Sequence, residues 1–318
     1  MTIEPLIDPT GRVMKKLRLN LLDACNMRCM YCMPEDQKFQ KINDLLSADE
    51  MKKIVANLLT FGVDEVRLTG GEPLLHPNFR SIIEALSPLK LKKLAITTNA
   101  ILLEDQIPFL LEHGVKHINI SLDSLQKKSF EFITKTNHFD TVFNTILKAK
   151  KAGFKIKLNT VMLKNINYEE IENFLAFSAK HDIEVRFLEL MKIGQALSYH
   201  ERHFVSADEA ISRISENWNL EKVPMPIDST SFNYLATNNG NIAKLGFIAS
   251  ESKPFCDGCS RLRLSNKGQL RPCIMINEGP NIKDLNDTSY EHVLNDLIAQ
   301  KPTHRLFGTE MKMNEIGG

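Results

Sequence analysis

Short apolar segments rich in β-branched residues alternate with longer amphipathic segments along the first two thirds of the chain. Six apolar segments have the length of buried strands, and helix-like segments fall between them. We expect strands over residues 16–22, 65–69, 93–98, 117–122, 155–163 and 184–190. The predicted helices span 48–60, 78–86, 104–113, 127–134, 141–152 and 168–181. Gly62, Gly114 and Gly153 stand just past helix ends, where a left-handed C-cap favours glycine.

Six β/α units in succession predict an α/β fold with a parallel sheet, because parallel strands need crossover connections. Six units rather than eight indicate a partial (β/α)6 barrel of the TIM type, with functional residues at the C-terminal ends of its strands. The alternation stops near residue 200. We therefore expect the partial barrel over 1–200 and a smaller α+β extension over 201–318.

Two local features are predicted in the extension. Ser206 caps a helix, and Glu209 stands three residues later, where it completes a capping box. The polar stretch from Pro224 to Asn241 has the composition of a connecting loop.

Composition narrows the class of protein. The chain is 43% hydrophobic and 25% charged, and its net charge of +1 argues against a general nucleic-acid or membrane-surface binder. No apolar run approaches the about 18 residues of a transmembrane helix. The N-terminus lacks the pattern of a signal peptide. Six cysteines in such a chain indicate a reducing, cytoplasmic location and metal ligation rather than disulfides.

Three of the cysteines, Cys25, Cys29 and Cys32, follow the first predicted strand at C-x3-C-x2-C spacing. Thiolates select zinc or iron–sulfur clusters over hard metals. Three thiolates leave one iron of a four-iron cluster without a protein ligand, and that open iron can bind a small molecule. Three unrelated buried cysteines are the alternative, but the flanking residues are polar and loop-like.

Polar residues follow several other predicted strands. The second strand runs into Gly70-Gly71-Glu72-Pro73, and paired glycines let a ligand approach the backbone closely. Thr97 to Asn99, Asn119 to Asp123 and Glu189 to Met191 occupy equivalent places. So many polar strand ends predict a ligand site at the top of the barrel.

The other cysteines, Cys256, Cys259 and Cys273, form a C-x2-C-x13-C group. A structural zinc site needs a fourth ligand, and His304 is poorly spaced for that role. A second three-cysteine iron–sulfur cluster is therefore preferred, with zinc kept as the alternative.

Arginines are interleaved with this second group. Arg261 and Arg263 point the same way in an extended segment, and Arg271 precedes the last cysteine by two positions. Guanidinium groups suit phosphate oxygens, so we expect an anionic substrate held against the second metal site.

The first cysteine group, with Tyr31 before its last member, resembles the signature of the radical S-adenosylmethionine (SAM) superfamily. In that superfamily the open iron chelates SAM, and the reduced cluster splits it into methionine and a 5′-deoxyadenosyl radical. The second group, its arginines and the C-terminal Gly317-Gly318 resemble the GTP 3′,8-cyclase (MoaA) family over nearly the whole chain.

The resemblance implies two [4Fe–4S] clusters, SAM as cofactor and GTP as substrate. The implied enzyme is a lyase that converts GTP to 3′,8-cyclo-7,8-dihydro-GTP, the first step of molybdopterin cofactor biosynthesis. Implied partners are an electron donor, protein or small molecule, and the downstream cyclic pyranopterin monophosphate synthase. We expect a homodimer or a monomer, without nucleic-acid or membrane partners.

Individual positions carry over from the family. Implied SAM contacts are Tyr31, Gly71, Ser121 and Met191. Implied GTP contacts are Arg18, Arg67, Thr97, Lys157, Arg261, Leu262 and Arg263, with Arg18 and Arg67 assigned as catalytic. Cluster ligands are Cys25, Cys29 and Cys32, and then Cys256, Cys259 and Cys273. The Gly317-Gly318 tail is expected to reach into the site.

Four segments depart from the family pattern. Glu65 replaces a lysine, Ala100 replaces a glycine, and His76-Pro77 replaces a basic pair. The common Leu-Arg-Leu-Ser-x-Thr-Asp is Leu-Arg-Leu-Asn-Leu-Leu-Asp over residues 17–23. The Leu-His-Pro form is common in radical SAM enzymes that act on peptides. A divergent member is therefore expected, with a radical SAM enzyme acting on a peptide as the alternative. A non-enzymatic protein with two zinc sites is a third interpretation.

Overall fold

The predicted alternation of strands and helices forms the centre of the computed structural model, which describes residues 5–285 and 287–317. The first six strands are β1 (Lys16–Asn20), β2 (Glu65–Thr69), β3 (Lys93–Thr98), β4 (His117–Ser121), β5 (Lys155–Val161) and β6 (Glu184–Leu188). They lie side by side in chain order, and every neighbouring pair is parallel. The partial (β/α)6 barrel is confirmed, although β1, β4, β5 and β6 end one or two residues before the predicted ends.

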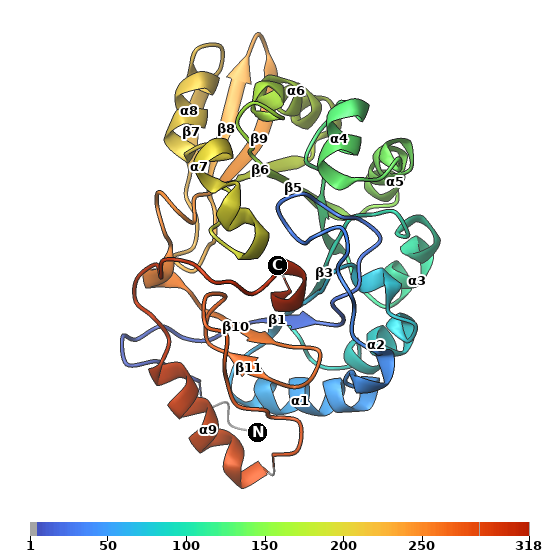
Figure 1. Cartoon of the computed structure of the whole chain (residues 1–318), viewed down its shortest axis with the longest axis vertical. Helices are drawn as coiled ribbons and strands as arrows, with labels where there is room; N and C mark the ends of the chain where they lie inside the picture. The colour runs from blue at the N-terminus through green and yellow to red at the C-terminus, as the bar shows by residue number, and fades with distance from the viewer. Residues whose placement is uncertain (1–4, 286, 318) are drawn as a thin grey trace.

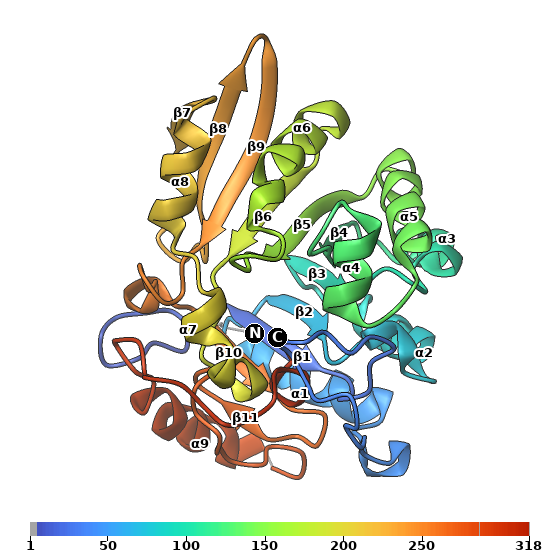
Figure 2. The ribbon, with the colours of Figure 1, turned by 45° about the horizontal axis from the view of Figure 1, so that its top comes forward.

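Six helices connect these strands and cover the outer face of the sheet (Figure 2). They are α1 (Ala48–Thr60), α2 (Phe79–Leu86), α3 (Ile107–Glu112), α4 (Lys127–Thr134), α5 (Phe139–Lys151) and α6 (Ile171–His181). Ser47 and Glu50 close a capping box at the start of α1. Gly62, Gly114 and Gly153 have φ angles of +82°, +72° and +97°, so the predicted left-handed helix ends are confirmed.

The second part of the chain adds strands to both edges of the same sheet (Figures 1 and 2). On one edge, β9 (Asn241–Ile248) pairs in parallel with β6, and β8 (Phe232–Asn238) and β7 (Asn219–Val223) follow it antiparallel. On the other, β10 (Arg261–Leu264) pairs in parallel with β1, and β11 (Leu270–Arg271) follows. The described chain also contains α7 (His200–His203), α8 (Ala207–Ser215), α9 (Asp287–Ala299) and α10 (Met313–Ile316). The expected C-terminal extension is present, and the boundary at residue 200 stays a prediction.

The extension corrects two local expectations. The stretch from Pro224 to Asn241 contains strand β8, because Phe232 and Tyr234 alternate with polar residues and pair with β9. The Ser206 hydroxyl accepts from the Glu209 amide at 3.1 Å, as predicted. In the described chain, however, the Glu209 carboxylate binds Lys164 instead of completing the capping box.

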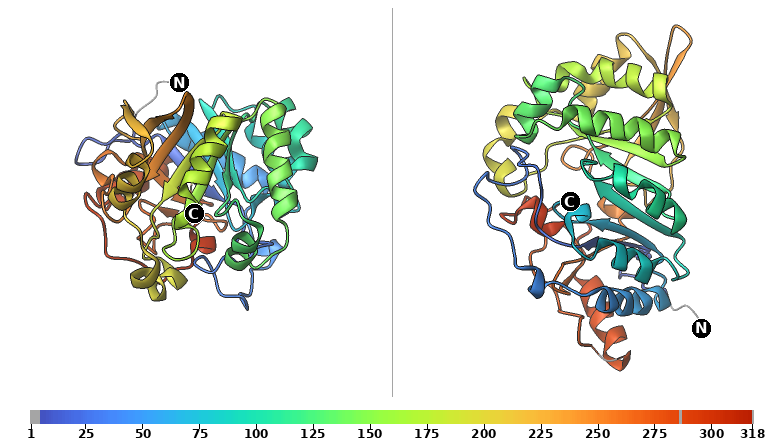
Figure 3. Two further views of the ribbon diagram at one scale, coloured as in Figure 1. Left: turned by 90° about the horizontal axis from the view of Figure 1, so that it is seen from above. Right: turned by 90° about the vertical axis from the view of Figure 1, so that its right-hand side faces the viewer.

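Strand alternation separates the hydrophobic core from the ligand side of the sheet. In β1, Leu17 and Leu19 are buried in one continuous hydrophobic core that includes the inner faces of the helices. Arg18 lies between them and faces the opposite side of the sheet. Seen from above, the C-terminal end of the chain lies on that inner side, in the middle of the surrounding elements (Figure 3, left). Among the described residues, no helix combines the length and apolar character needed to cross a membrane.

Candidate active site

A cavity of about 310 Å³ at the C-terminal ends of the barrel strands is lined by all six cysteines. Cys25, Cys29 and Cys32 lie on the loop after β1, as the strand pattern predicts. The second group flanks β10 and β11. The fold therefore brings two cysteine groups from distant parts of the chain to one cavity.

The glycine-rich loop after β2 holds the first cysteine loop in place. The Gly71 amide donates to the Leu22 carbonyl at 2.7 Å, and the Glu72 amide donates to the Ala24 carbonyl at 2.8 Å. A Cβ on Gly71 would stand 2.2 Å from the Ala24 oxygen. Glycine is required here because the two loops approach too closely for any side chain.

The two cysteine groups differ in their electrostatic surroundings. Burial raises the pKa of Cys25 to about 11 and that of Cys32 to about 12. Burial also acts on Cys259, but Arg261 and Lys301 outweigh it and lower the pKa of this thiol to about 6. Burial raises the pKa of Cys256 in the second group as well. Thiolates at Cys25 and Cys32 therefore need a bound cation, whereas basic side chains already stabilise the thiolate of Cys259.

Both groups offer sulfur donors only, which fits iron–sulfur clusters. Three thiols around an open cavity fit a [4Fe–4S] cluster with one free iron at Cys25, Cys29 and Cys32. Within the described chain, no three His, Cys, Asp or Glu side chains surround a single metal position. His304 lines the same cavity as the second group, although its side chain is exposed.

Two basic side chains brace the second cysteine group from behind. Arg12 donates to the Cys256 carbonyl at 2.8 Å and forms a buried ion pair with Asp8. Lys301 is 6% exposed and donates to the Arg261 carbonyl at 2.7 Å. These contacts fix the backbone on which the cysteines are carried.

Positive charge is concentrated on the cavity wall. The lining includes Arg18, Arg186, Arg261, Arg263 and Arg305. Arg18 lies in register between Arg67 on β2 and Arg263 on β10. Burial, followed by repulsion from these two neighbours, holds the pKa of Arg18 well below its usual value. Burial and Arg261 lower the pKa of Arg263 to about 10. This wall is arranged to receive an anion.

Some of the predicted GTP contacts reach the cavity and others lie behind it. The lining includes Arg18, Thr97, Arg261 and Arg263. Arg67 instead donates to the Ile96 carbonyl at 3.2 Å, and Lys157 is paired with Glu184 at 2.8 Å. The Leu262 side chain is fully buried in the hydrophobic core, so only its backbone can face a ligand.

All four predicted SAM contacts line the cavity, namely Tyr31, Gly71, Ser121 and Met191. The Tyr31 hydroxyl donates to Asp123 at 2.7 Å, and the Val161 amide donates to the other carboxylate oxygen of Asp123 at 2.9 Å. Burial nevertheless raises the pKa of Asp123 to about 6. Asp123 thus ties the cysteine loop to the ends of β4 and β5 and presents a desolvated carboxylate to the cavity.

The C-terminal tail is part of this region. Met313 and Asn314 of α10 line the cavity. Arg263 donates to the Gly317 carbonyl at 2.6 Å, and Asn314 donates to the Asp23 carbonyl at 2.9 Å. The predicted position of Gly317 beside the site fits these contacts, while Gly318 lies outside the described residues.

The departures from the family pattern lie outside the cavity lining. His76 is 4% exposed, and its Nδ1 accepts from the Asn78 amide at 3.1 Å. Glu65 is at the N-terminal end of β2, away from the cavity, and is in register with Lys93 on β3. Ala100 adopts a φ of +66°, a conformation in which glycine is less strained. The Leu-His-Pro form therefore brings no side chain towards a substrate.

Several site residues were missed at the sequence level. Arg186 lines the cavity and is held by Glu184, whose Oε1 accepts from Nε at 2.6 Å. Its position two residues after Glu184 on a predicted strand was a usable signal, because both side chains must share one face. Arg12, Lys301 and Asn314 act on distant backbone groups and carry no such local signal.

Family models divide the chain into two matches. Residues 19–178 match the model described as the radical SAM superfamily, and residues 183–307 match Molybdenum Cofactor Synthesis C. The fold is similar to Streptococcus suis SuiB bound to precursor peptide SuiA, with a TM-score of 0.66 and 17% identity over 93% of this chain and 67% of the other. Native anSMEcpe with bound AdoMet has a TM-score of 0.62 at 15% identity, covering 92% of this chain and 82% of the other. At these identities the likeness concerns the fold alone.

Similarity to curated sequences is much closer. A GTP 3′,8-cyclase from Synechocystis sp. is 44% identical over 313 residues, which are 98% of this chain and 95% of the relative. One from Clostridium botulinum is 37% identical over 98% of this chain and the whole of the relative. The two cysteine groups, the cavity that they share and this full-length similarity agree with one another. The chain belongs to the radical SAM superfamily and, within it, to the GTP 3′,8-cyclase family.

Proposed function

We propose that this protein is a GTP 3′,8-cyclase, a lyase that converts GTP to 3′,8-cyclo-7,8-dihydro-GTP in the first step of molybdenum-cofactor biosynthesis. One observation carries this proposal: both cysteine groups and five arginines line the same cavity. A nucleotide triphosphate there would meet an anion-binding wall between two cluster sites. The curated relatives named GTP 3′,8-cyclase support the same reaction.

Cys25, Cys29 and Cys32 would hold the first [4Fe–4S] cluster. Bound there, the cluster together with SAM would supply the radical chemistry that removes hydrogen from C3′ of GTP; joining of C3′ to C8 with uptake of one electron and one proton would give the product. Tyr31 and Gly71 would place SAM beside the cysteine loop, because both lie on that loop or directly against it. Ser121 and Met191 would bound it from the ends of β4 and β6.

Cys256, Cys259 and Cys273 would hold a second [4Fe–4S] cluster. The low pKa of Cys259 supports a thiolate ligand, because Arg261 and Lys301 stabilise its negative charge. A zinc ion with His304 as fourth ligand is the alternative for this group. Eight irons per chain in the anaerobically purified protein would support two clusters, while one zinc with four irons would favour the alternative.

Arginine side chains would bind the GTP triphosphate. Arg18, Arg261 and Arg263 repel one another in the free protein, and an anion between them would remove that repulsion. Thr97 lies on the same wall. Arg67 and Lys157 stay predicted GTP contacts. To bind GTP, Arg67 would have to release the Ile96 carbonyl and Lys157 would have to release Glu184.

The remaining interpretations concern the whole protein. We place the domain boundary near residue 200, about twenty residues after the point between 178 and 183 where one family match ends and the other begins. We also propose a cytoplasmic location, because six free cysteines and reducible clusters need a reducing compartment. We propose two partners, an electron donor and the downstream cyclic pyranopterin monophosphate synthase. We also propose that the protein is a homodimer or a monomer.

Incubation of the reduced, cluster-loaded protein with SAM and GTP tests the function directly. We expect 5′-deoxyadenosine and a cyclised nucleotide with the mass of GTP, both detected by liquid chromatography and mass spectrometry. Cys32→Ala should abolish both products. Abundant 5′-deoxyadenosine formed independently of GTP would contradict the assignment of the substrate.

A further inference from the structure

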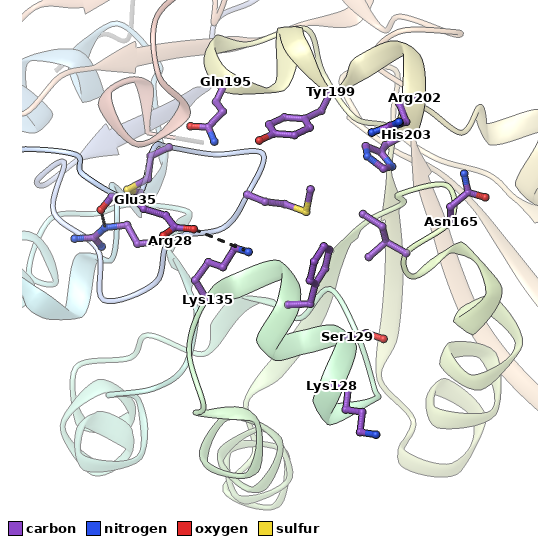
Figure 4. Close-up of a pocket in the computed structure, with 14 residues that line it drawn as sticks. Arg28, Glu35, Lys128, Ser129, Lys135, Asn165, Gln195, Tyr199, Arg202 and His203 are labelled. Atoms are coloured by element: carbon purple, nitrogen blue, oxygen red, sulfur yellow. Dashed lines mark hydrogen bonds and ion pairs between the residues drawn. The ribbon is translucent and has the colours of Figure 1, made fainter.

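A groove of about 660 Å³ lies on the outer side of the first cysteine loop, behind the cavity described above (Figure 4). Its walls are the loop over residues 28–35, helix α4, and the segment over 195–203 that includes α7. Met33 follows Cys32 directly and lines both the groove and the cavity. The peptide segment that carries the cysteines therefore forms the partition between the two spaces.

On its outer side, the cysteine loop is hydrogen-bonded to helix α4, which forms a wall of the groove. The Arg28 and Met30 amides donate to the carbonyls of Thr134 and Ile133 at the end of α4, both at 2.9 Å. The Arg28 guanidinium donates to the Cys25 carbonyl at 2.6 Å. A group bound in the groove would be separated from the first cysteine group only by this loop.

The groove is markedly positive although the whole chain has a net charge of only +1. Its Lys and Arg side chains are Arg28, Lys128, Lys135 and Arg202, against the single carboxylate of Glu35. Lys135 lies 4.0 Å from Glu35. Lys128 and Arg202 are exposed, and the described part of the chain provides neither with an ion-pair partner. The charge is therefore available to a partner.

An exposed aromatic residue stands among these cations. Phe132 is 53% exposed, and the Lys135 ammonium lies 4.8 Å from the centre of its ring. Tyr199 faces the same hollow from the other wall (Figure 4), and Ile166 also lines it. An apolar centre surrounded by charges that are mostly positive is typical of transient docking surfaces, where complementary charge raises the association rate.

We propose that this groove docks the acidic face of a one-electron donor protein, which reduces the first cluster through the cysteine loop. The inference rests on the proposed function, because it requires a cluster at Cys25, Cys29 and Cys32. SAM and the nucleotide would fill the inner cavity, so the outer side of the loop is the open approach. In the step, a flavin hydroquinone anion gives one electron to [4Fe–4S]²⁺, yielding the neutral semiquinone and [4Fe–4S]⁺ without breaking a bond.

Charge reversal tests the surface without altering the cavity. Lys128→Glu combined with Arg202→Glu would be compared with Lys52→Glu combined with Lys53→Glu, an exposed pair on α1. Cluster bleaching would be followed by stopped-flow absorbance in the cluster-loaded protein with SAM and no GTP. The probes are a purified acidic flavodoxin in its hydroquinone form and photoreduced 5-deazariboflavin, a small uncharged reductant.

We expect the groove variant to slow reduction by flavodoxin by about tenfold or more at low salt and to lose most of the salt dependence. Its reduction by deazariboflavin should stay within about twofold of the parent protein, because docking is not needed. The α1 variant should match the parent with both probes. Phe132→Ala should weaken flavodoxin binding measured by calorimetry.

Equal flavodoxin rates for the parent protein and the groove variant would overturn the proposal. Slowing with both probes would also overturn it, because the effect would then lie in the cluster itself. Failure of the proposed function would give a different result. Iron analysis would find the same iron content in the parent protein and in Cys32→Ala, so no four-iron cluster would be assigned to this group, and neither probe would bleach the protein.

Discussion

We expect Arg18 to favour substrate binding but to lower the folding stability of the free protein. Its neighbours in register across the sheet are Arg67 and Arg263, and burial with their repulsion lowers its pKa well below the usual value. In the described chain no carboxylate forms an ion pair with it. The free protein therefore holds a costly charge that an anionic substrate would neutralise.

Arg18→Leu should separate these two effects. We expect the unfolding free energy of the nucleotide-free protein to rise by about 1 kcal/mol, because an unpaired charge is removed. GTP affinity should fall about ten- to hundredfold, since a charge-assisted hydrogen bond is lost. Urea denaturation and calorimetric titration measure the two quantities. Lys155→Leu, an exposed change at the start of β5, is the control and should leave GTP affinity unaltered.

The residue scale also shows where sequence reasoning works. Cysteine spacing singled out both cysteine groups that line the cavity, because ligand spacing is a local property. Arg186 was within reach of the same reasoning, since strand alternation aligns it with Glu184. Arg12 was not, because its contact with the Cys256 carbonyl depends on how segments 244 residues apart meet.

At the scale of elements, the second cysteine segment depends on a brace from the N-terminal segment. Asp8 and Arg12 form an ion pair whose side chains are 0% and 6% exposed. Burial alone would raise the pKa of Asp8, but hydrogen bonds from Arg12 and Thr10 outweigh it, so the pKa is lowered. Arg12 then holds the carbonyls of Cys256 and Pro302.

Arg12→Met should cost about 3–5 kcal/mol of unfolding free energy at pH 7, because Asp8 is left buried and unpaired. The contribution from Asp8 is present above its ordinary pKa of 3.8 and is lost as the pH falls through the lower folded value. Chemical denaturation at pH 7 and near pH 3 measures this difference.

A surface pair provides the control for this prediction. Arg213→Met removes an ion pair with Glu169, whose side chain is 71% exposed, and should cost about 1 kcal/mol or less. Iron content gives an independent check: Arg12→Met should lose iron from the second group before the first. Equal costs for the two variants would contradict a bracing role for Arg12.

Element prediction succeeded where the pattern was local and failed where pairing was distant. Helices α1 and α4 match their predicted bounds because amphipathic spacing and polar ends define them. Strand β8 was hidden in a polar stretch, because its alternation is short and is broken where Leu235 and Ala236 follow Tyr234 directly. Nothing in the sequence of β10 indicates that it pairs with β1.

At the scale of the whole molecule, the two ends of the chain meet at the site. Asn20 on β1 donates to the Glu315 carbonyl at 2.9 Å, and Arg263 on β10 holds the Gly317 carbonyl. Gly317 has a φ of +76°, and a Cβ there would lie 2.7 Å from the Thr69 hydroxyl oxygen. The tail therefore has little room for change.

Adding one alanine after Gly318 should lower the rate of GTP cyclisation by about tenfold or more, because the tail is packed between strand ends. Gly317→Ala should have a similar effect. The unfolding midpoint should change little in the extended protein. Uncoupled 5′-deoxyadenosine formation distinguishes a displaced substrate from a lost cluster, and an unchanged cyclisation rate would refute a role for the tail.

The pairing of β9 with β6 and of β10 with β1 has a consequence for synthesis of the protein. When the six β/α units leave the ribosome, both edges of their sheet still expose unpaired backbone groups. The segments that will cover those edges are translated last, so the nascent barrel stays aggregation-prone until they have been synthesised and paired. Delay or truncation late in translation would therefore endanger the part of the chain that is already complete.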